Sequence, residues 1–218
     1  MTEVIPAILE KSFPEIERKI HLVENYVHWV QIDIADGTLV DNNTYIETDR
    51  YNTFHLSGGT DTPPISTLNF ELHMMVKKPL KYLDSYMEVG FKRFFAHVEG
   101  DQVEDFILKC QEADVEVGLA IDGPTPWEKI HPYLDNIDAL LVMAIEAGES
   151  GKPYREDTGE KIRKIKEIDF DLPIAVDGAM NEENARKVVA AGATRINSNS
   201  YIFKSPDVKA AIETLKQL

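Results

Sequence analysis

Three polar residues stand inside apolar runs that predict buried β-strands. Asp33 lies within WVQIDI, His73 lies within FELHMM, and Asp177 ends the run PIAVD. An unpaired buried carboxylate is costly, so such residues usually hydrogen-bond, bind a metal or take part in catalysis. Two carboxylates and an imidazole can transfer protons or hold a divalent cation. We therefore predict that Asp33, His73 and Asp177 share one functional site.

The elements that would position these residues alternate along the chain. The eight expected strands, which are apolar and rich in β-branched residues, cover 4–9, 29–34, 70–76, 93–98, 116–121, 139–145, 173–177 and 194–199. Helical spacing follows seven of them, at 13–26, 80–90, 103–113, 126–134, 159–168, 181–192 and 205–218. No clean helical periodicity occurs in 38–69, so the second unit is expected to be irregular.

This alternation predicts a parallel sheet covered by helices. No linker or low-complexity stretch divides the 218 residues, so we expect a single domain over 1–218 with the α/β fold of a (β/α)8 TIM barrel. The alternative is a doubly wound open sheet, whose dinucleotide-binding form needs a Gly-rich turn after the first strand. The segment PAILEKSF contains no glycine, which disfavours that form.

Composition excludes several classes of protein and of site. The formal net charge of −15 argues against broad binding to nucleic acid or to an anionic membrane, because phosphates are held by clustered Lys and Arg. It leaves room for a small phosphorylated substrate, which a few backbone N–H groups can hold. The single cysteine, Cys110, excludes an internal disulfide. No signal peptide or membrane span is evident, so we expect a cytoplasmic protein.

In a barrel of this kind, the active site lies at the carboxyl ends of the strands. His97 at one such end is expected to be a core histidine whose ring nitrogens are paired locally. The polar and pocket-facing residues found at these ends are Gln31, Asp33, Asp36, His73, His97, Glu99, Asp122, Met143, Glu146, Asp177, Asn197, Asn199 and Ser200.

Several of these segments resemble the motifs of ribulose-phosphate 3-epimerases. The strand-two, strand-three, strand-four and strand-seven motifs of that family are similar to WVQIDIADGTLVDN, ELHMMVKKP, FFAHVEG and IAVDGAMN. IPAIL, LVMAIEAGESGK and NSNSYIFKSPD also resemble the family, in the right order. The resemblance covers nearly the whole chain apart from 38–69, and it implies the same barrel.

The resemblance also implies a reaction. Family members invert the carbon next to the ketone of a ketopentose 5-phosphate, by removing a proton from one face and returning one to the other. Asp33 and Asp177 match the two aspartates that do this. The resemblance implies a divalent metal, such as Zn, Mn, Fe, Co or Mg, that stabilises the enediolate and is held by both aspartates and two histidines. His73 matches one histidine, and Gln31 replaces the other.

Gln31 leaves two interpretations of the metal site open. Its amide oxygen is a hard, neutral donor, and Asp33, His73 and Asp177 would remain as three further ligands. In the other interpretation, Gln31 and His73 simply hydrogen-bond the two aspartates in a metal-free site.

The phosphate end departs from the family pattern as well. Gly148 and Gly151 remain in the loop after the sixth strand, but Glu149 and Ser150 stand between them. Asn199 replaces a glycine, and asparagine tolerates the left-handed backbone that glycine would supply. Compensation is expected from Lys152 and from the hydroxyls of Ser150, Ser198 and Ser200. The residues expected to bind substrate or phosphate are His73, Met143, Gly148, Gly151, Gly178, Asn199 and Ser200.

We therefore expect a divergent sugar-phosphate 3-epimerase acting on a ketopentose or ketohexose phosphate. One alternative is a lyase using a similar enediolate, but related decarboxylase barrels carry a lysine at the third strand and FELHMM has none. Another is a degenerate paralogue that binds a sugar phosphate without turnover, which Gln31 and Glu149 favour. The resemblance also implies a homo-oligomer, either a dimer or a hexamer.

Overall fold

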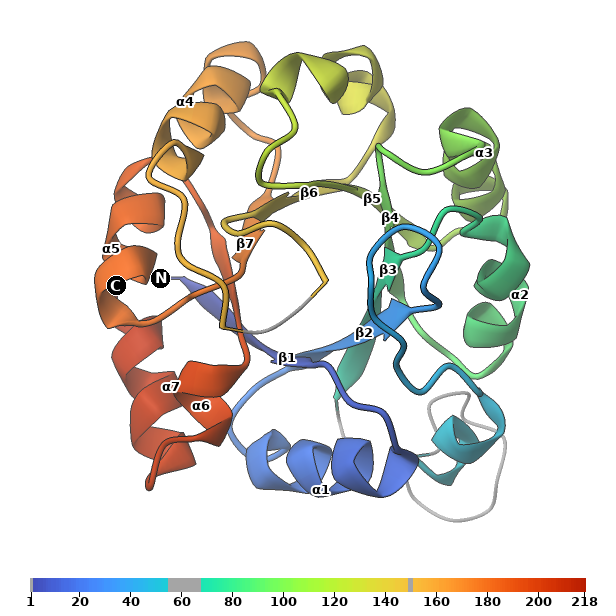
Figure 1. The fold of residues 1–218 in the computed structure, drawn as a ribbon, viewed down its shortest axis with the longest axis vertical. Coiled ribbons are helices and arrows are strands. Elements are labelled where there is room, and N and C mark those ends of the chain that lie inside the picture. The colour runs from blue at the N-terminus through green and yellow to red at the C-terminus, as the bar shows by residue number, and fades with distance from the viewer. Residues whose placement is uncertain (1, 55–67, 149–150) are drawn as a thin grey trace.

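Eight parallel strands close into a barrel in chain order, with β8 pairing back onto β1 (Figure 1). The computed structural model describes residues 2–54, 68–148 and 151–218. The strands are β1 (Glu3–Ile8), β2 (Trp29–Ala35), β3 (Asn69–Met75), β4 (Arg93–His97), β5 (Glu116–Ile121), β6 (Ala139–Met143), β7 (Ile174–Asp177) and β8 (Arg195–Ser198). The expected (β/α)8 barrel is confirmed.

Helices surround the strands on the outside of the barrel, as Figure 1 shows. The α-helices are α1 (Phe13–Val23), α2 (Leu80–Glu88), α3 (Val103–Glu112), α4 (Thr158–Ile168), α5 (Glu182–Ala190), α6 (Ser200–Phe203) and α7 (Val208–Lys216). In the described part of the chain, no helix has the length and apolar character needed to cross a bilayer.

Two of the connections between strands differ from regular α-helices. The prediction of a helix over 126–134 is wrong in type: the segment forms two 3-10 helices, η2 (Trp127–Lys129) and η3 (His131–Asn136). Pro132 lacks the N–H that an α-helix would need at that position. The irregular second unit contains the 3-10 helix η1 (Asp49–Phe54), and the rest of that prediction, at 55–67, lies outside the described residues.

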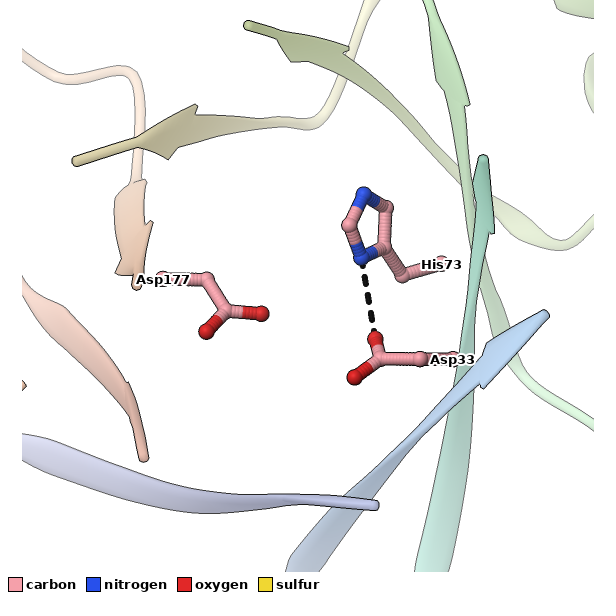
Figure 2. Close-up of side chains that lie close together, drawn as sticks. All are labelled: Asp33, His73 and Asp177. Atoms are coloured by element: carbon pink, nitrogen blue, oxygen red, sulfur yellow. Dashed lines mark hydrogen bonds and ion pairs between the residues drawn. The ribbon is translucent and has the colours of Figure 1, made fainter. Parts of the chain in front are cut away.

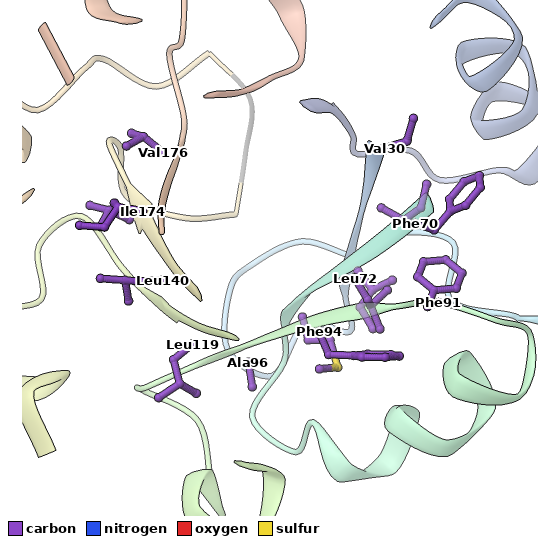
Figure 3. Packing of buried hydrophobic residues seen from close by; sticks show 14 of the residues in the cluster. Val30, Phe70, Leu72, Phe91, Phe94, Ala96, Leu119, Leu140, Ile174 and Val176 are labelled. Carbon is purple, nitrogen blue, oxygen red and sulfur yellow. The ribbon is translucent and has the colours of Figure 1, made fainter. Parts of the chain in front are cut away.

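The main hydrophobic core lies between the outer face of the strands and the helices (Figure 3). Successive residues of a strand point to opposite faces, so alternate apolar residues such as Phe70, Leu72 and Met74 face outward and are fully buried. This layer accounts for the continuous apolar runs in the sequence. The residues between them point into the barrel.

The interior of the barrel is partly polar, and the strand register arranges its side chains in layers. Gln31 is in register with Glu71, and Asp33 with His73, on the pair β2 and β3. Arg93 on β4 is in register with both Glu71 and Glu116. Glu71, Arg93 and Glu116 therefore form a charged layer toward the start of the strands. Asp33 and His73 lie toward the ends of the strands, where this fold places active sites.

Candidate active site

Asp33 and Asp177 approach each other across the barrel mouth from β2 and β7. Figure 2 shows the two carboxyl groups pointing toward one another, with His73 of β3 beside Asp33. The side chains are nearly enclosed, with 6% of Asp33, 9% of Asp177 and none of His73 exposed. The predicted grouping of these three residues is therefore present in the structure.

Gln31 lies beneath the two carboxylates and links them. Its Nε2 donates hydrogen bonds to Asp33 Oδ1 at 2.7 Å and to Asp177 Oδ2 at 2.8 Å. Its Oε1 instead accepts a hydrogen bond from Asn197 Nδ2 at 2.6 Å. The amide nitrogen, and not the oxygen that could ligate a metal, therefore faces the site.

A second set of contacts holds His73. Its Nδ1 lies 2.9 Å from Asp33 Oδ1, and its Nε2 lies 2.9 Å from Nε2 of His97. The other ring nitrogen of His97, Nδ1, lies 3.0 Å from Glu99 Oε2. The expectation that both ring nitrogens of His97 have partners is met.

The order of the hydrogen bonds from His73 to His97 to Glu99 shows which ring nitrogens carry a proton. Burial acts to raise the pKa of Glu99, but the hydrogen bond from His97 and other contacts outweigh it and lower this pKa to about 2. Glu99 is therefore an acceptor, and Nδ1 of His97 donates to it. Nε2 of His97 then accepts from Nε2–H of His73, which leaves Nδ1 of His73 with its lone pair toward the site.

The pocket shifts the pKa of each of these three residues in the direction that favours its neutral form. Burial, followed by the electrostatic interaction with His97, lowers the pKa of His73 to about 3. Burial raises the pKa of Asp33 to about 8. Burial and the neighbouring charge of Asp33 raise the pKa of Asp177 to about 7. Carboxyl groups that titrate near neutral pH are suited to accept and return a proton.

The same three residues fit a divalent metal. One ligand atom from each of Asp33, His73 and Asp177 can be chosen so that all lie within 4.8 Å of one another. Two carboxylate oxygens and an imidazole nitrogen form a suitable donor set with an open position. The residues present therefore fit a three-ligand site, whereas the Gln31 oxygen points away from it.

A cavity at the mouth of the barrel brings most of the predicted site residues together. Gln31, which is fully buried, does not line it. The strand-end residues Asp36, His97, Glu99, Asp122 and Glu146 and the phosphate-end residues Lys152 and Ser198 do not line it either. The predicted residues that line it are Asp33, His73, Met143, Gly148, Gly151, Asp177, Gly178, Asn197, Asn199 and Ser200. Apolar side chains such as Leu9, Met75, Ile145 and Met180 complete the wall.

Gly178 keeps the cavity open directly after Asp177. Its φ is +100°, and a Cβ atom there would lie 2.5 Å from the side chain of Ile145. The Gly178 backbone N–H also hydrogen-bonds Asp177, which acts to lower the pKa of that carboxyl. A residue with a side chain at this position would be strained and would crowd the wall.

The phosphate end differs in part from expectation. Asn199 has φ −102°, so the left-handed backbone expected there is not adopted. The Ser198 hydroxyl donates to the Met180 carbonyl, and Nζ of Lys152 donates to the Ala147 carbonyl. The expectations for Glu149 and Ser150 lie outside the described residues.

Lys19 of α1 was not predicted from the sequence. Its Nζ donates to Asn199 Oδ1 at 3.1 Å and lies 2.8 Å from Glu10 Oε1. It is only 7% exposed, which is unusual for a lysine. Lys19 lies three residues after Ile16 and next to Ile20, on the buried face of α1. The helical spacing of the sequence therefore already indicates that this lysine is buried.

Comparisons with known proteins support these observations. The model of the ribulose-phosphate 3 epimerase family matches residues 3–203. The ribulose-phosphate 3-epimerase of Rhodobacter capsulatus is 29% identical, over 94% of this chain and 88% of its own. That of Bacillus subtilis is 27% identical, over 99% of both chains.

Solved structures share the fold at lower identity. A 3-keto-L-gulonate-6-phosphate decarboxylase from Vibrio cholerae superposes with a TM-score of 0.72 at 10% identity, covering 99% of this chain and 95% of its own. That likeness concerns the barrel alone, whereas the family match extends over most of the sequence. With its barrel and its matching strand motifs, the chain belongs to the ribulose-phosphate 3-epimerase family.

Proposed function

We propose that this protein epimerises a ketopentose phosphate at C3, interconverting ribulose 5-phosphate and xylulose 5-phosphate. The observation that carries the proposal is the position of Asp33 and Asp177. Both lie within 2.8 Å of the same amide nitrogen of Gln31, although they come from β2 and β7. A sugar carbon held above that nitrogen has one carboxyl group on each side.

The reaction needs a base on one face of C3 and an acid on the other. One aspartate removes the C3 proton, the bonding electrons shift into an enediolate, and the other aspartate donates its proton to the opposite face of C3. The raised pKa values of both carboxyl groups support this exchange of roles, because each can be protonated or ionised near neutral pH. The reverse reaction uses the same groups in exchanged roles.

Asp33, His73 and Asp177 would hold the divalent metal that the family implies. When bound, such an ion supplies positive charge that stabilises the oxygens of an enediolate. His73 is oriented for this by His97 and Glu99, which leave its Nδ1 without a proton. The apolar wall of Met75, Met143, Ile145 and Met180 excludes water around the carboxyl groups.

The sugar phosphate group would bind at the other end of the cavity. Gly148, Gly151 and Gly178 have positive φ values, which turn the backbone sharply beside the pocket. With Asn199 and Ser200 they would present backbone N–H groups to the phosphate. Lys19, held against Asn199, would add positive charge to this end.

Nothing in the described residues favours the lyase alternative. The residues of β3 on the same face as His73 are Asn69, Glu71, His73 and Met75, and none is a lysine. The choice between turnover and binding alone is decided by experiment.

The direct test follows hydrogen exchange at C3. We expect the protein, supplied with Mn²⁺, Co²⁺, Fe²⁺, Zn²⁺ or Mg²⁺ in D₂O, to form xylulose 5-phosphate from ribulose 5-phosphate and to incorporate deuterium at C3, as followed by NMR. Binding of the sugar phosphate without label uptake under any of these conditions would reject turnover of this substrate.

A further inference from the structure

A chain of buried polar side chains runs through the middle of the barrel to the two carboxylates. Arg93 Nη1 pairs with Glu71 Oε2 at 2.5 Å, and Asn197 Nδ2 donates to Glu71 Oε1 at 2.8 Å. The same Nδ2 donates to Gln31 Oε1. Arg93, Glu71, Asn197 and Gln31 are each at most 2% exposed. We call these four residues the core relay.

The chemistry of each group fixes the direction of the next hydrogen bond. Arginine has only donors, so Glu71 must accept from Arg93. Burial raises the pKa of Glu71, and the ion pair with Arg93 and the hydrogen bond from Asn197 act against burial and favour the ionised form. An ionised Glu71 can only accept, so Asn197 must turn its NH₂ group toward it. That NH₂ group also faces Gln31, so Gln31 must present its oxygen there. Its own NH₂ group is thereby directed to Asp33 and Asp177.

This orientation leaves one polar atom unsatisfied. Oδ1 of Asn197 is buried and has no hydrogen-bond partner among the described residues. Leaving a buried acceptor unpaired costs about 1–3 kcal/mol. Turning the Asn197 amide over would place that oxygen against the Glu71 carboxylate, which is worse. The orientation of Asn197 is therefore set by its two acceptors.

We propose that Asn197 and Glu71 are positioning residues that lock the Gln31 NH₂ group onto both aspartates, so that Gln31 is a double hydrogen-bond donor and not a metal ligand. A metal at this site is then held by three residues. The proposal rests on the proposed function only where it assigns proton transfer to the two aspartates. Its tests measure metal affinity and amide orientation, so they stand or fail independently of turnover.

The first test reverses the core relay without changing its size or net charge. In the double variant Glu71→Gln with Asn197→Asp, the new amide must turn its oxygen to Arg93 and its NH₂ group to residue 197. The new carboxylate then accepts from both sides, and Gln31 must turn over to donate to it. The Gln31 oxygen would face Asp33 and Asp177 as a fourth ligand.

We expect the double variant to bind Mn²⁺ more tightly than the wild type by about tenfold or more in calorimetric titrations. The single variant Glu71→Gln is an intermediate case, because its amide can donate to Asn197, whose amide can then turn over and accept from Gln31. It should change the Mn²⁺ affinity in the same direction as the double variant. Gln31→His is the positive control, since it adds a ligand whatever the relay does. Wild-type affinity in the double variant, with a gain in Gln31→His, would overturn the proposal.

The second test reads the orientation in the unaltered protein. The chain has four glutamines, at 31, 102, 111 and 217, and only Gln31 is buried. With ¹⁵N in the glutamine side-chain amides, the NH₂ signals of Gln31 should exchange slowly and show NOEs to the β-protons of Asp33 and Asp177. NOEs from this NH₂ group to residue 197 alone would contradict the proposal, even if the double variant failed to fold.

Discussion

Asp33 and Asp177 each accept a hydrogen bond from the same side-chain amide nitrogen, that of Gln31. An amide donates without carrying a charge, so it orients both carboxylates and stabilises their ionised forms less than a cation would. Burial therefore keeps the pKa values of both carboxyl groups high. Each aspartate should be individually necessary, because no other carboxyl group lines the cavity in the described part of the chain.

We predict that Asp33→Asn and Asp177→Asn each lower kcat by about 10²-fold or more, since each removes one proton-transfer group. Ribulose 5-phosphate consumption measures this, with thermal unfolding as a check on folding. Retention of wild-type kcat in either variant would contradict the two-base scheme.

A variant of Lys19 tests the phosphate end. Lys19→Met removes the cation and its hydrogen bond to Asn199 while keeping the length of the side chain. We predict that KM for the sugar phosphate rises by about tenfold while kcat changes little, because substrate binding is weakened equally in the ground state and the transition state. Lys11→Met, at an exposed position shortly before α1, is the control. A fall in kcat at constant KM would place Lys19 outside phosphate binding.

The helices around the barrel contribute to its stability through the residues at their ends. Asp207 caps α7, where its side chain accepts a hydrogen bond from the Ala210 N–H at 2.9 Å. Because α7 packs on α1, α5 and β1 and lies outside the cavity, the strength of this cap should affect stability and not catalysis.

We predict that Asp207→Ala lowers the free energy of unfolding by about 1 kcal/mol, the usual effect of losing an N-cap. Urea denaturation measures the loss, and kcat should stay at the wild-type value. Asp207→Ser retains a capping oxygen and should recover most of the stability. An equal loss in both variants would show that the cap is unimportant.

The sequence predicts the barrel well because its strands are covered on the outside. Continuous apolar runs mark these strands, and Asp33, His73 and Asp177 stand out against them. An α-helix is predicted at 126–134 because the apolar residues there have helical spacing. Pro132 has no backbone N–H to donate to an α-helical hydrogen bond, so the segment forms 3-10 helices instead.

The hydrogen bonds of the core relay were not predicted, although the alternation of inward and outward residues along the strands indicates that Gln31 and Glu71 point into the barrel. Gln31 lies two residues before Asp33, Glu71 two before His73, and all four point into the barrel. Which atom of the Gln31 amide faces the site could not be read from the sequence, since it depends on Asn197 from a strand 166 residues away. Lys19 is positioned by a tertiary contact in the same way.

At the scale of the whole molecule, the enclosed carboxyl groups link stability to pH. The folded protein binds protons at Asp33 and Asp177 more tightly than the unfolded chain does, because their pKa values are raised to about 8 and about 7. Their contribution to stability is therefore present below the unfolded pKa, near 4, and is lost as pH rises toward 8.

We predict that, with a chelator present, Asp33→Asn is more stable than the wild type near pH 9 and that this advantage shrinks toward pH 4. Tm measured by calorimetry across this range tests the sign. Added Mn²⁺ should restore the wild type at high pH, because the metal pairs with the ionised carboxylates. A constant difference in Tm at all pH values would mean that Asp33 titrates alike in both states.

The charged layer at the start of the strands also extends the relay to the opposite face of the barrel. Arg93 pairs with Glu116, Glu116 with Arg195, and Arg195 with Glu3. A barrel of this construction is not an inert frame on which catalytic loops can be exchanged. Grafting the loops of this mouth onto a barrel with a hydrocarbon interior would transfer the aspartates but lose the groups that orient Gln31 beneath them.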